Sequence, residues 1–312
     1  MRDATTTHRI LVIKLGALGD FVQAMGPMAA IRAHHPDAEI TLLTTKPYAA
    51  LGEACPYVDR VWVDERPKAL QIGKWLELRG RLRSGNFTRV YDLQTSDRSG
   101  FYAKLLGRTV EWSGIAKGCS LPHANPNRDF MHTIERQAEQ LAMAGIAETP
   151  LPDLSWAEAD LSRFALPGRF ALLVPGGAPH RPAKRWPPEN FGVLANRLLD
   201  AEILPVILGA GAEAEIGQAI SGICPGVRSL IGETGFLEIA ALAKKATAAV
   251  GNDTGPMHII TLSGCPSVAL YSHESDPALC AQRGPQVSIL RKPSLGEVTV
   301  DDVWRALAPS IP

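Results

Sequence analysis

The residues best suited to chemistry in this sequence are gathered in one short segment, residues 251–258. Its polar members are Asn252, Asp253, Thr254 and His258. The segment follows an apolar run at 246–250, so it is expected where a buried strand passes into a helix, with Asp253 or Thr254 as the cap. Such a junction offers free backbone N–H groups and the positive end of a helix dipole, which suit a phosphate group. A cap needs only one of these polar residues, so the surplus predicts a ligand site.

A second candidate segment, residues 175–185, combines two glycines with several cations. Gly176 and Gly177 follow an apolar run at 170–174 and would let the backbone approach a ligand closely. Lys184 and its neighbouring arginines could neutralise a leaving diphosphate. Basic charge alone would usually indicate a solvated loop, so both interpretations are open from these residues alone.

Two other predicted strand ends are followed by charged residues. Asp20 closes a glycine-bearing loop after an apolar run at 10–14, and taken alone it is well placed to cap a helix over 21–34. Asp97 and Arg98 follow a later run of the same kind. Because ligands of open α/β sheets bind beyond the carboxyl ends of the strands, these residues are expected at the edge of a cleft.

Glu213 lies in a segment that also holds Gly209 and Gly211. Its position indicates an ordinary acid in the first turn of a helix, unless a ligand lies nearby. The two glycines lack the third glycine of a dinucleotide fingerprint, because position 214 is Ala. A nicotinamide-dependent oxidoreductase is therefore disfavoured.

Short β-branched runs alternate with longer amphipathic stretches along the whole chain. Strands are predicted at 10–14, 40–44, 61–63, 90–93, 170–174, 205–208, 229–231, 248–251 and 268–271, and helices at 21–34, 69–83, 131–144, 191–199 and 237–246. This alternation predicts parallel sheets built from right-handed crossovers. Each half opens with a strand and a glycine-bearing loop, and a Pro-containing segment at 148–168 separates the halves. We therefore predict an α/β fold with two Rossmann-like, doubly wound domains, residues 1–155 and 156–312, facing a central cleft.

Composition limits the class of function. The 312 residues are 46% hydrophobic and 21% charged, the balance of an ordinary globular protein. Lys plus Arg and Asp plus Glu both number 32, which argues against a general nucleic-acid binder. The five cysteines are scattered and lack C-x-x-C spacing, which indicates neither a disulfide framework nor a structural zinc site and fits a reducing cytosol.

Hydropathy predicts a cytoplasmic protein that at most touches a membrane surface. Residues 1–9 are polar and lack the apolar core of a signal peptide, and no apolar run approaches the ~18–20 residues of a membrane-spanning helix. Residues 66–89 hold seven Lys and Arg against a single acid, Glu77. Most such runs are solvated helix faces, but this one could also bind phosphates or a membrane surface.

Three segments in order carry a resemblance to a known family. Residues 251–271 resemble a signature of the lipopolysaccharide heptosyltransferases, which form glycosyltransferase family 9. Residues 10–20 resemble the first strand and glycine-rich loop of that family, and residues 184–191 resemble its donor-phosphate loop running into a helix. The ordered set spans residues 10–276, which is most of the chain.

The resemblance implies an inverting, metal-independent GT-B glycosyltransferase that needs no cofactor. It would move heptose from ADP-heptose to an inner-core lipopolysaccharide sugar. Asp20 matches the proposed catalytic base, which takes the proton of the acceptor hydroxyl opposite the departing phosphate. Donor contacts are expected from Gly176, Gly177, Lys184, Glu213, Asp253, Thr254, Gly255 and His258. Acceptor contacts are expected from Gly19, Asp97 and Arg98.

The donor residues are expected to divide between phosphate, sugar and nucleoside. Lys184 matches the family's lysine against the donor phosphates, with the helix start at Thr254 beside it. Asp253 is assigned to the sugar, because a carboxylate next to a diphosphate is unfavourable. His258 could donate to phosphate or pack inside its helix, and Glu213 could accept from the ribose or base.

The chain departs from the family pattern at two places, which leaves the donor's identity open. Gly177, Ala178 and Pro179 stand where some members have Ser or Thr hydroxyls, so backbone N–H groups must serve there. Residues 273–275 replace most of a Gly-Pro-Thr-Asp-Pro-like turn. Alternatives are a transferase that uses another nucleotide sugar, a sugar-nucleotide epimerase and a non-catalytic nucleotide-sugar-binding protein.

The resemblance also implies the partners. These are an ADP-sugar donor and a lipid-linked anionic sugar acceptor, with peripheral contact at the inner face of the inner membrane and no nucleic acid. The sequence has no D-x-D motif at a strand end, as a metal-dependent transferase would require, and Asp301 and Asp302 are expected at the start of the C-terminal helix.

Overall fold

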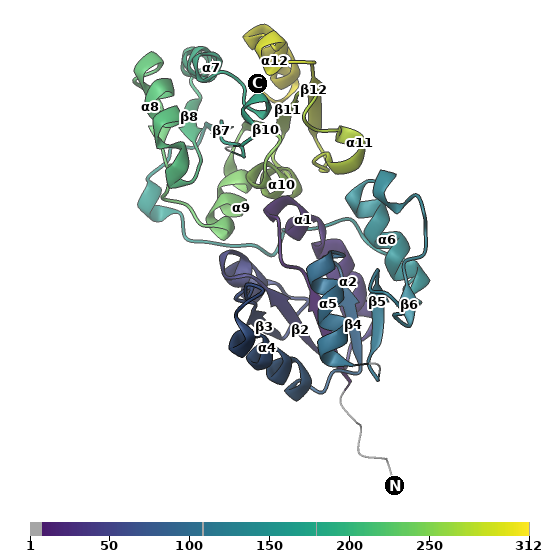
Figure 1. Cartoon of the computed structure of the whole chain (residues 1–312). Coiled ribbons are helices and arrows are strands. Elements are labelled where there is room, and N and C mark those ends of the chain that lie inside the picture. The colour runs from purple at the N-terminus through teal and green to yellow at the C-terminus, as the bar shows by residue number, and fades with distance from the viewer. Residues whose placement is uncertain (1–7, 108, 179, 312) are drawn as a thin grey trace. The chain divides into compact units, whose positions relative to one another are not determined.

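The computed structural model describes residues 8–107, 109–178 and 180–311. The chain divides into two compact units, Met1–Pro152 (unit 1) and Asp153–Pro312 (unit 2). Each unit holds one six-stranded parallel sheet with helices on its faces (Figure 1). Most of the polar N-terminal segment falls in residues 1–7, outside the described residues.

The sheet of unit 1 has the strand order β3-β2-β1-β4-β5-β6. Its strands are β1 (Arg9–Ile13), β2 (Glu39–Thr44), β3 (Arg60–Val63), β4 (Arg89–Asp92), β5 (Glu111–Gly114) and β6 (Leu121–Pro122). Its helices are α1 (Leu18–Gln23), α2 (Met25–His34), α3 (Ala49–Ala54), α4 (Ile72–Ser84), α5 (Asp97–Leu106) and α6 (Thr133–Met143), with short 3₁₀ turns η1 (Lys46–Tyr48) and η2 (Arg128–Phe130). β1 is buried after its first residue, as expected for a central parallel strand covered on both faces.

The helices of unit 1 are positioned by apolar side chains that face the sheet. α4 contributes Leu78 and Leu82, and α5 contributes Tyr102 and Leu106, to one core cluster with β1. α2 packs against α6. The cluster therefore fixes α4 and α5 side by side on one face of the sheet.

The sheet of unit 2 has the order β12-β11-β10-β7-β8-β9. Its strands are β7 (Phe170–Val174), β8 (Leu204–Ile207), β9 (Arg228–Ser229), β10 (Ala248–Asn252), β11 (Ser267–Tyr271) and β12 (Val287–Arg291). Its helices are α7 (Pro188–Asp200), α8 (Ala214–Ile223), α9 (Phe236–Lys245), α10 (Gly255–Leu262), α11 (Pro277–Cys280) and α12 (Val300–Leu307), with 3₁₀ turns η3 (Ser162–Phe164), η4 (Pro182–Lys184), η5 (Gly211–Glu213), η6 (Leu295–Glu297) and η7 (Ala308–Ser310).

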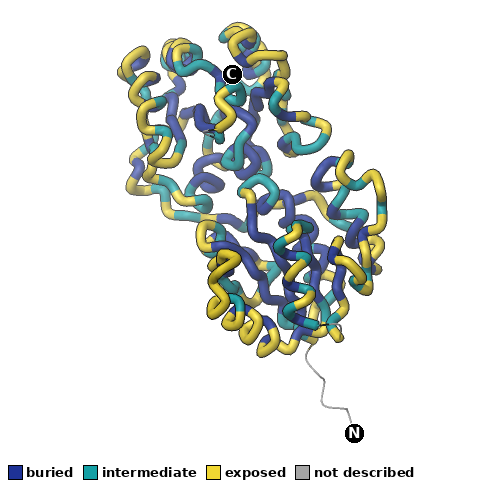
Figure 2. Tube along the Cα trace, in the orientation of Figure 1, coloured by how far each residue is buried: buried dark blue, intermediate teal, exposed yellow. Residues whose placement is uncertain are grey.

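One aromatic side chain anchors the loop after β7 in the core of unit 2. Trp186 is fully buried, stacks edge to face on Phe191 of α7, and donates its indole N–H to the Val298 carbonyl over 2.8 Å. α7, α8 and α12 contribute to this core cluster, and α9 packs against α10. Figure 2 shows the buried strands of each unit enclosed by helices with exposed outer faces.

Both units share one strand order when each is numbered from its own first strand, namely 3-2-1-4-5-6. In this order the chain leaves the first strand on one side and returns on the other. The switch point lies between β1 and β4 in unit 1, and between β7 and β10 in unit 2. Ligands of doubly wound sheets bind at the carboxyl ends of these strands.

The helix predicted over 21–34 differs from the observed structure. It begins at Leu18 and is interrupted at Ala24, giving α1 and α2. Pro27 has no N–H to donate to the carbonyl four residues earlier, which explains why one continuous helix does not form. The N-cap is Ala17, without a side-chain hydrogen bond, so Asp20 lies inside the first turn and the capping interpretation of Asp20 is wrong.

None of the helices in the described part of the chain is long and apolar enough to cross a bilayer.

Candidate active site

The loop after β7 is held in place by the hydrogen bonds of a single amide side chain. Asn252, fully buried at the end of β10, donates to the carbonyls of Pro175 and Gly176 over 2.8 and 3.1 Å. Its Oδ1 accepts the N–H of Trp186 at 2.9 Å. One side chain thus fixes both ends of the predicted phosphate loop, and Gly176 and Gly177 are buried within it.

Lys184 and Asp253 form an ion pair at the edge of the same loop. Lys184 Nζ lies 2.6 Å from Asp253 Oδ2, and the two side chains are only 14% and 8% exposed. The other oxygen, Oδ1, lies 3.0 Å from the Tyr271 hydroxyl and 3.3 Å from Gln282 Nε2. The structure therefore brings together two predicted donor residues that are 69 positions apart in the sequence.

The charge on Asp253 is stabilised by its neighbours. Burial alone would raise the pKa of Asp253, but hydrogen bonds from Lys184 and Ser275 and the charges of Lys184 and His258 outweigh it, so the pKa lies below its ordinary value. The carboxylate is therefore kept ionised. Its charge in turn holds the ammonium of Lys184 at the carboxyl edge of the sheet.

Helix α10 begins directly beside this pair. Thr254 occupies the N-cap position with an extended backbone, and its side chain makes no capping hydrogen bond. Pro256 lies in the first turn, as expected, and Gly255 is the first helical residue. His258 is buried, and it is close enough to Asp253 to influence its pKa. The backbone start of α10 and the Thr254 hydroxyl are thus the capping groups left for a ligand.

Glu213 has the first-turn position that its sequence context indicated. Its Oε2 accepts the N–H of Ala210 at 2.7 Å. A methyl group on Gly176 would lie 3.1 Å from the Glu213 carboxyl carbon, so only glycine fits against this acid without displacing it. The contact of Glu213 with a nucleoside stays a prediction.

Arg185 is a further cation of the loop. Its guanidinium donates to the Gly177 carbonyl at 2.6 Å, and its buried Nε has no hydrogen-bond partner among the described residues. Pro179 lies outside the described residues, while Ala178 is half-buried.

The loop after β1 in unit 1 is held in a comparable way. Gln94 Oε1 accepts the N–H groups of Leu15 and Gly16 at 2.8 and 3.2 Å. Gly16 has a φ of +132°, and a methyl group there would lie 2.7 Å from the Tyr48 ring, so this position requires glycine. The loop delivers Asp20 half-buried in the first turn of α1.

Two buried charges lie beneath this loop. Lys14 Nζ donates to the Leu93 carbonyl at 3.0 Å. Burial lowers the pKa of Lys14, and the negative charges of Asp20 and Asp92 partly offset that effect. Burial also raises the pKa of Asp92 to about 6, against hydrogen bonds from Thr95, Ser99 and Gln94 and the charge of Lys14. The floor of the unit 1 loop therefore holds a lysine and an aspartate, and burial disfavours the charged form of each. Asp20 lies at the outer side of this pair.

The predicted acceptor residues lie on two helices of unit 1. Gly19 precedes Asp20 in α1, whereas Asp97 and Arg98 begin α5 after the capping residue Ser96. Arg98 donates to the Pro67 carbonyl at 3.2 Å, and its guanidinium lies 5.5 Å from the Trp75 ring centre. Asp97 is exposed. Their acceptor role stays a prediction.

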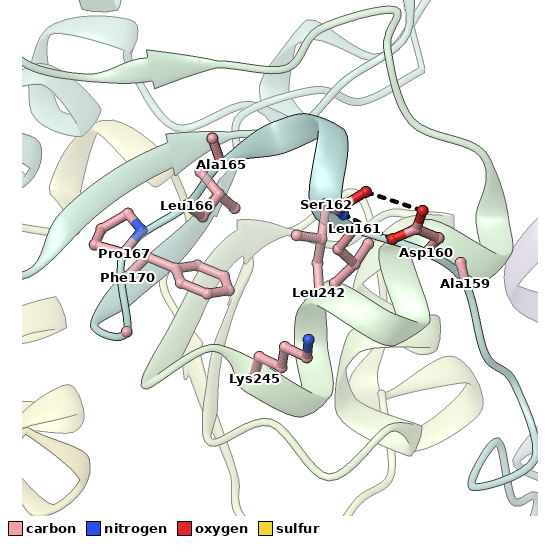
Figure 3. Close-up of a pocket in the computed structure, with 11 residues that line it drawn as sticks. Ala159, Asp160, Leu161, Ser162, Ala165, Leu166, Pro167, Phe170, Leu242 and Lys245 are labelled. Carbon is pink, nitrogen blue, oxygen red and sulfur yellow. Dashed lines mark hydrogen bonds between the residues drawn. The ribbon is translucent and has the colours of Figure 1, made fainter.

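A pocket of about 680 Å³ in unit 2 lies away from these residues (Figure 3). It is lined by residues 159–162, 165–168 and 170 and by Leu242 and Lys245 of α9. Asp160 forms two hydrogen bonds with Ser162 at its rim, at 2.9 Å each. Phe170 is the first residue of β7, so this pocket lies at the amino end of the strand, opposite the end where ligands of such sheets bind.

The residues that hold the site in place could not be recognised from local sequence patterns. Asn252 belongs to the polar segment 251–258, but no role is predicted for it from the sequence. No local pattern indicates Gln94, Tyr271 or Gln282, because their hydrogen-bond partners are distant in sequence. Among the described residues, no group of three or more His, Cys, Asp or Glu is arranged to hold a metal ion.

Comparison with known proteins identifies the family. Residues 75–297 match the model of glycosyltransferase family 9 (heptosyltransferase). A putative glycosyltransferase of Haemophilus influenzae is 40% identical over 301 residues, covering 86% of this chain and 84% of that protein. Lipopolysaccharide heptosyltransferase 2 of Escherichia coli is 28% identical over 291 residues, covering 86% of this chain and 83% of that protein.

The solved structure of the E. coli ADP-heptose lipopolysaccharide heptosyltransferase II is similar, with a TM-score of 0.81 at 24% identity, covering 97% of this chain and 98% of that chain. This likeness confirms the predicted α/β fold class, a GT-B structure with two doubly wound domains. The family match confirms the resemblance read from the three sequence segments. The chain belongs to glycosyltransferase family 9, the heptosyltransferases.

Proposed function

We propose that this heptosyltransferase moves heptose from ADP-heptose to a lipid-linked inner-core lipopolysaccharide sugar, with inversion at the anomeric carbon and without a metal ion. The observation that carries the donor half is the buried Lys184–Asp253 pair beside the start of α10. The family supports heptose as the sugar. The name of the similar E. coli enzyme supports ADP as the nucleotide.

The diphosphate is expected to lie between the loop after β7 and the start of α10. The N–H groups at a helix start and the cation of Lys184 both favour the charge that develops on the leaving ADP. Gly176 and Gly177 admit the phosphates close to the backbone. These groups do the work that a divalent cation does in metal-dependent transferases.

Lys184 can contact the diphosphate while it stays paired with Asp253. We expect the ammonium to bridge the carboxylate and the β-phosphate, because three donor hydrogens allow both contacts. Asp253 then orients Lys184 through one oxygen, and its sugar contact is made by the other. Glu213 and His258 complete the donor site at the nucleoside and phosphate.

Asp20 is proposed as the general base. Its carboxylate takes the proton from the acceptor hydroxyl as the oxygen attacks the anomeric carbon, and the bond to the β-phosphate breaks with its electron pair leaving on ADP. Attack opposite the leaving group inverts the configuration. Gly19, Asp97 and Arg98 are proposed to contact the acceptor.

This chemistry assigns one role to each domain. Residues 1–155 would bind the acceptor and residues 156–312 the donor. We propose a cytoplasmic enzyme in peripheral contact with the inner face of the inner membrane, because the proposed acceptor is lipid-linked.

The proposal is tested by a donor panel followed by product analysis. ADP-heptose is expected to raise the melting temperature more than UDP- or GDP-sugars, because the ligand with the lowest Kd stabilises the native state most at a given concentration. A ligand present at ~100 times its Kd adds ~2.7 kcal/mol to the free energy of unfolding. Incubation with ADP-heptose and inner-core acceptor should release ADP and give a product of inverted anomeric configuration. Stronger stabilisation by a UDP-sugar would mean that the donor is not ADP-heptose. A product that retains the anomeric configuration would contradict the inverting mechanism.

A further inference from the structure

An exposed apolar patch lies on the outer side of α4 and α5, far along the chain from the predicted donor residues. Three large apolar side chains of one groove are exposed, Ile72 by 68%, Leu76 by 60% and Phe101 by 41%. Leu70, two residues before α4, is 94% exposed. Ile72 and Leu76 are four residues apart, so they share one face of α4. Monomeric proteins rarely expose a contiguous group of this kind without a binding function.

Helix α4 therefore carries two apolar stripes. Leu78 and Leu82 face the core of unit 1, as in any amphipathic helix. Ile72 and Leu76 point elsewhere and line an open groove of about 540 Å³ between α4 and α5. Figure 2 shows that the outer side of α4 is largely exposed. Packing within unit 1 does not explain this second stripe.

Aromatic rings form the floor of the groove. Trp75 of α4 meets Phe101 of α5 edge to face, with ring centres 5.2 Å apart. The cations of Arg98 and Lys104 lie 5.5 Å from the Trp75 ring and 5.9 Å from the Phe101 ring. Amphipathic aromatic side chains with flanking cations are typical of surfaces at the level of lipid headgroups.

The charge around the patch selects the partner. Residues 66–107 hold nine Lys and Arg against three Asp and Glu, an excess of six cations. Because the whole chain sums to zero, the remaining residues carry an excess of six acids. One of the three acids, Asp92, is buried below the sheet edge. Lys68 and Arg79 are exposed at the border of the apolar side chains. Arg79 and Arg98 line the groove together with one acid, Asp97. Two other cations of this segment, Lys74 and Arg89, are paired with acids outside it.

We propose that the α4–α5 face is a docking surface for an anionic lipid bilayer, with Leu70, Ile72 and Leu76 entering the headgroup region and the surrounding cations contacting lipid phosphates. Interfacial binding combines buried apolar area with attraction to anionic lipid, and this face offers both. The inference deepens the proposed function and rests on it only for the reason to be at a membrane, since the acceptor proposed there is lipid-linked.

The test is co-sedimentation of the full chain with vesicles that contain neither donor nor acceptor. Vesicles with about one quarter phosphatidylglycerol in phosphatidylethanolamine should bind the protein, and purely phosphatidylcholine vesicles should bind it weakly. Raising the salt from ~0.05 to ~0.5 M should weaken binding, because surface charges are then screened. Ile72→Glu and Leu76→Glu should each reduce binding about tenfold or more, and Lys68→Ala and Arg79→Ala about fivefold each.

The control is Val193→Glu, at a 50% exposed position of α7 in unit 2, which should bind vesicles like the parent. Circular dichroism melting curves should establish that each variant is folded. Equal binding by the parent and all four variants, or no binding to anionic vesicles, would overturn the proposal. So would a parent dimer, seen by analytical ultracentrifugation, that Leu76→Glu dissociates, because a second copy would then be the occupant.

The two proposals fail separately. Transfer to a water-soluble, deacylated acceptor needs no membrane, so Leu76→Glu should leave that rate unchanged while vesicle binding falls. A parent protein that binds vesicles but transfers no sugar would refute the proposed function alone.

Discussion

At both switch points, an amide side chain at the end of the fourth strand, or just after it, holds the loop that follows the first strand. In unit 1, Gln94 lies just after β4 and accepts two N–H groups of the loop after β1. In unit 2, Asn252 ends β10 and makes three hydrogen bonds to the loop after β7. The shared topology thus places an amide side chain against the loop in both units, although the residue is Gln in one and Asn in the other.

The charged pairs at these sites differ. In unit 1 the lysine directly follows β1, and Lys14 and Asp92 are both buried, with the pKa of Asp92 raised to about 6. In unit 2 the lysine comes ten residues after β7, on η4, and Lys184 contacts Asp253 directly, with the pKa of Asp253 lowered. The pair in unit 1 lies under its loop, and the pair in unit 2 lies at the edge of its loop.

The neighbouring strand adds a second difference. After β2, Tyr48 packs against Gly16 in unit 1, whereas after β8, Glu213 packs against Gly176 in unit 2. An aromatic ring and an acid thus occupy corresponding places. We interpret the unit 1 switch point as a support that presents Asp20, and the unit 2 switch point as a surface that itself meets the ligand.

The largest expected effect concerns Asp20. If unit 1 supplies the base, Asp20→Asn should lower the rate of heptose transfer by ~10²–10⁴-fold, the usual contribution of a positioned base, and leave donor affinity unchanged. Steady-state transfer rates and ADP-heptose titration measure the two quantities. Asp37→Asn, in an exposed turn before β2, is the matched control. A transfer rate within about threefold of the parent would end the role of Asp20 as base and weaken the interpretation of unit 1.

Lys184→Met should have the next largest effect, because it leaves Asp253 buried without its cation. Removal of one partner from a buried pair typically costs ~3–5 kcal/mol, and the residual exposure of this pair places it near the lower limit. Urea denaturation measures the loss, and peptide-resolved hydrogen exchange assigns it to unit 2. Donor affinity should fall in parallel.

Lys74→Met is the matched control for stability. Lys74 pairs with Glu65 at 2.9 Å, but these side chains are 50% and 71% exposed. Such surface pairs contribute at most ~1 kcal/mol. The double variant Lys184→Met, Asp253→Asn should recover part of the stability but not the donor affinity. A Lys184→Met variant as stable as Lys74→Met would mean that the unit 2 pair is not coupled as the structure indicates.

The two aspartates at the strand ends should affect stability with opposite pH dependence. Asp92 binds its proton more tightly in the folded protein, with a pKa of about 6 against 3.8, so its contribution is complete below pH 3.8 and is lost as the pH rises through about 6. Asp253 has a lowered folded pKa, so its contribution is present above pH 3.8 and is lost as the pH falls through the folded value.

Asp92→Asn should therefore gain stability relative to the parent as the pH rises from 4 to 7, by about 2.4 kcal/mol. Asp253→Asn should lose most relative to the parent at neutral pH and less in acid. Urea denaturation of both variants at each pH gives the two slopes. Slopes of the same sign would contradict the difference between the two sites.

Much of the fold could be predicted because parallel strands buried on both faces leave continuous apolar runs. The runs that became β1, β7 and β10 were recognisable for this reason. β5 was missed, since it has four residues and only Trp112 is a large apolar side chain. β12 was missed as well, because it is a half-buried edge strand whose alternation covers only five residues.

The types of residue in the candidate site could be predicted from the sequence, but the contacts between them could not. Glycines, cations and a candidate cap at strand ends are visible locally, so the loop residues and Asp253 could be proposed as candidates from the sequence. The Lys184–Asp253 contact and the bonds of Asn252 and Gln94 join segments more than 60 residues apart. Only the strand order brings those segments together.

The smallest effect expected concerns Glu213 and asks whether the acid in unit 2 belongs to the ligand or only to its helix. Glu213→Ala removes the acceptor of the Ala210 N–H and should cost about 1 kcal/mol, a usual value for a lost capping bond. Glu215→Ala, an exposed acid in the first turn of α8, should cost no more than ~0.5 kcal/mol.

Stability alone cannot separate the two roles of Glu213, so donor affinity decides between them. If Glu213 contacts the ribose or base, Glu213→Ala should weaken ADP-heptose binding by about tenfold, whereas a helix cap predicts a change of less than about twofold. Glu213→Gln keeps an acceptor for Ala210 and a polar end for the nucleoside, so it should lie near the parent in both measurements. Unchanged affinity in Glu213→Ala would make this acid the counterpart of Tyr48, a packing residue behind the loop, and would leave Lys184 and α10 as the ligand-facing part of the unit 2 switch point.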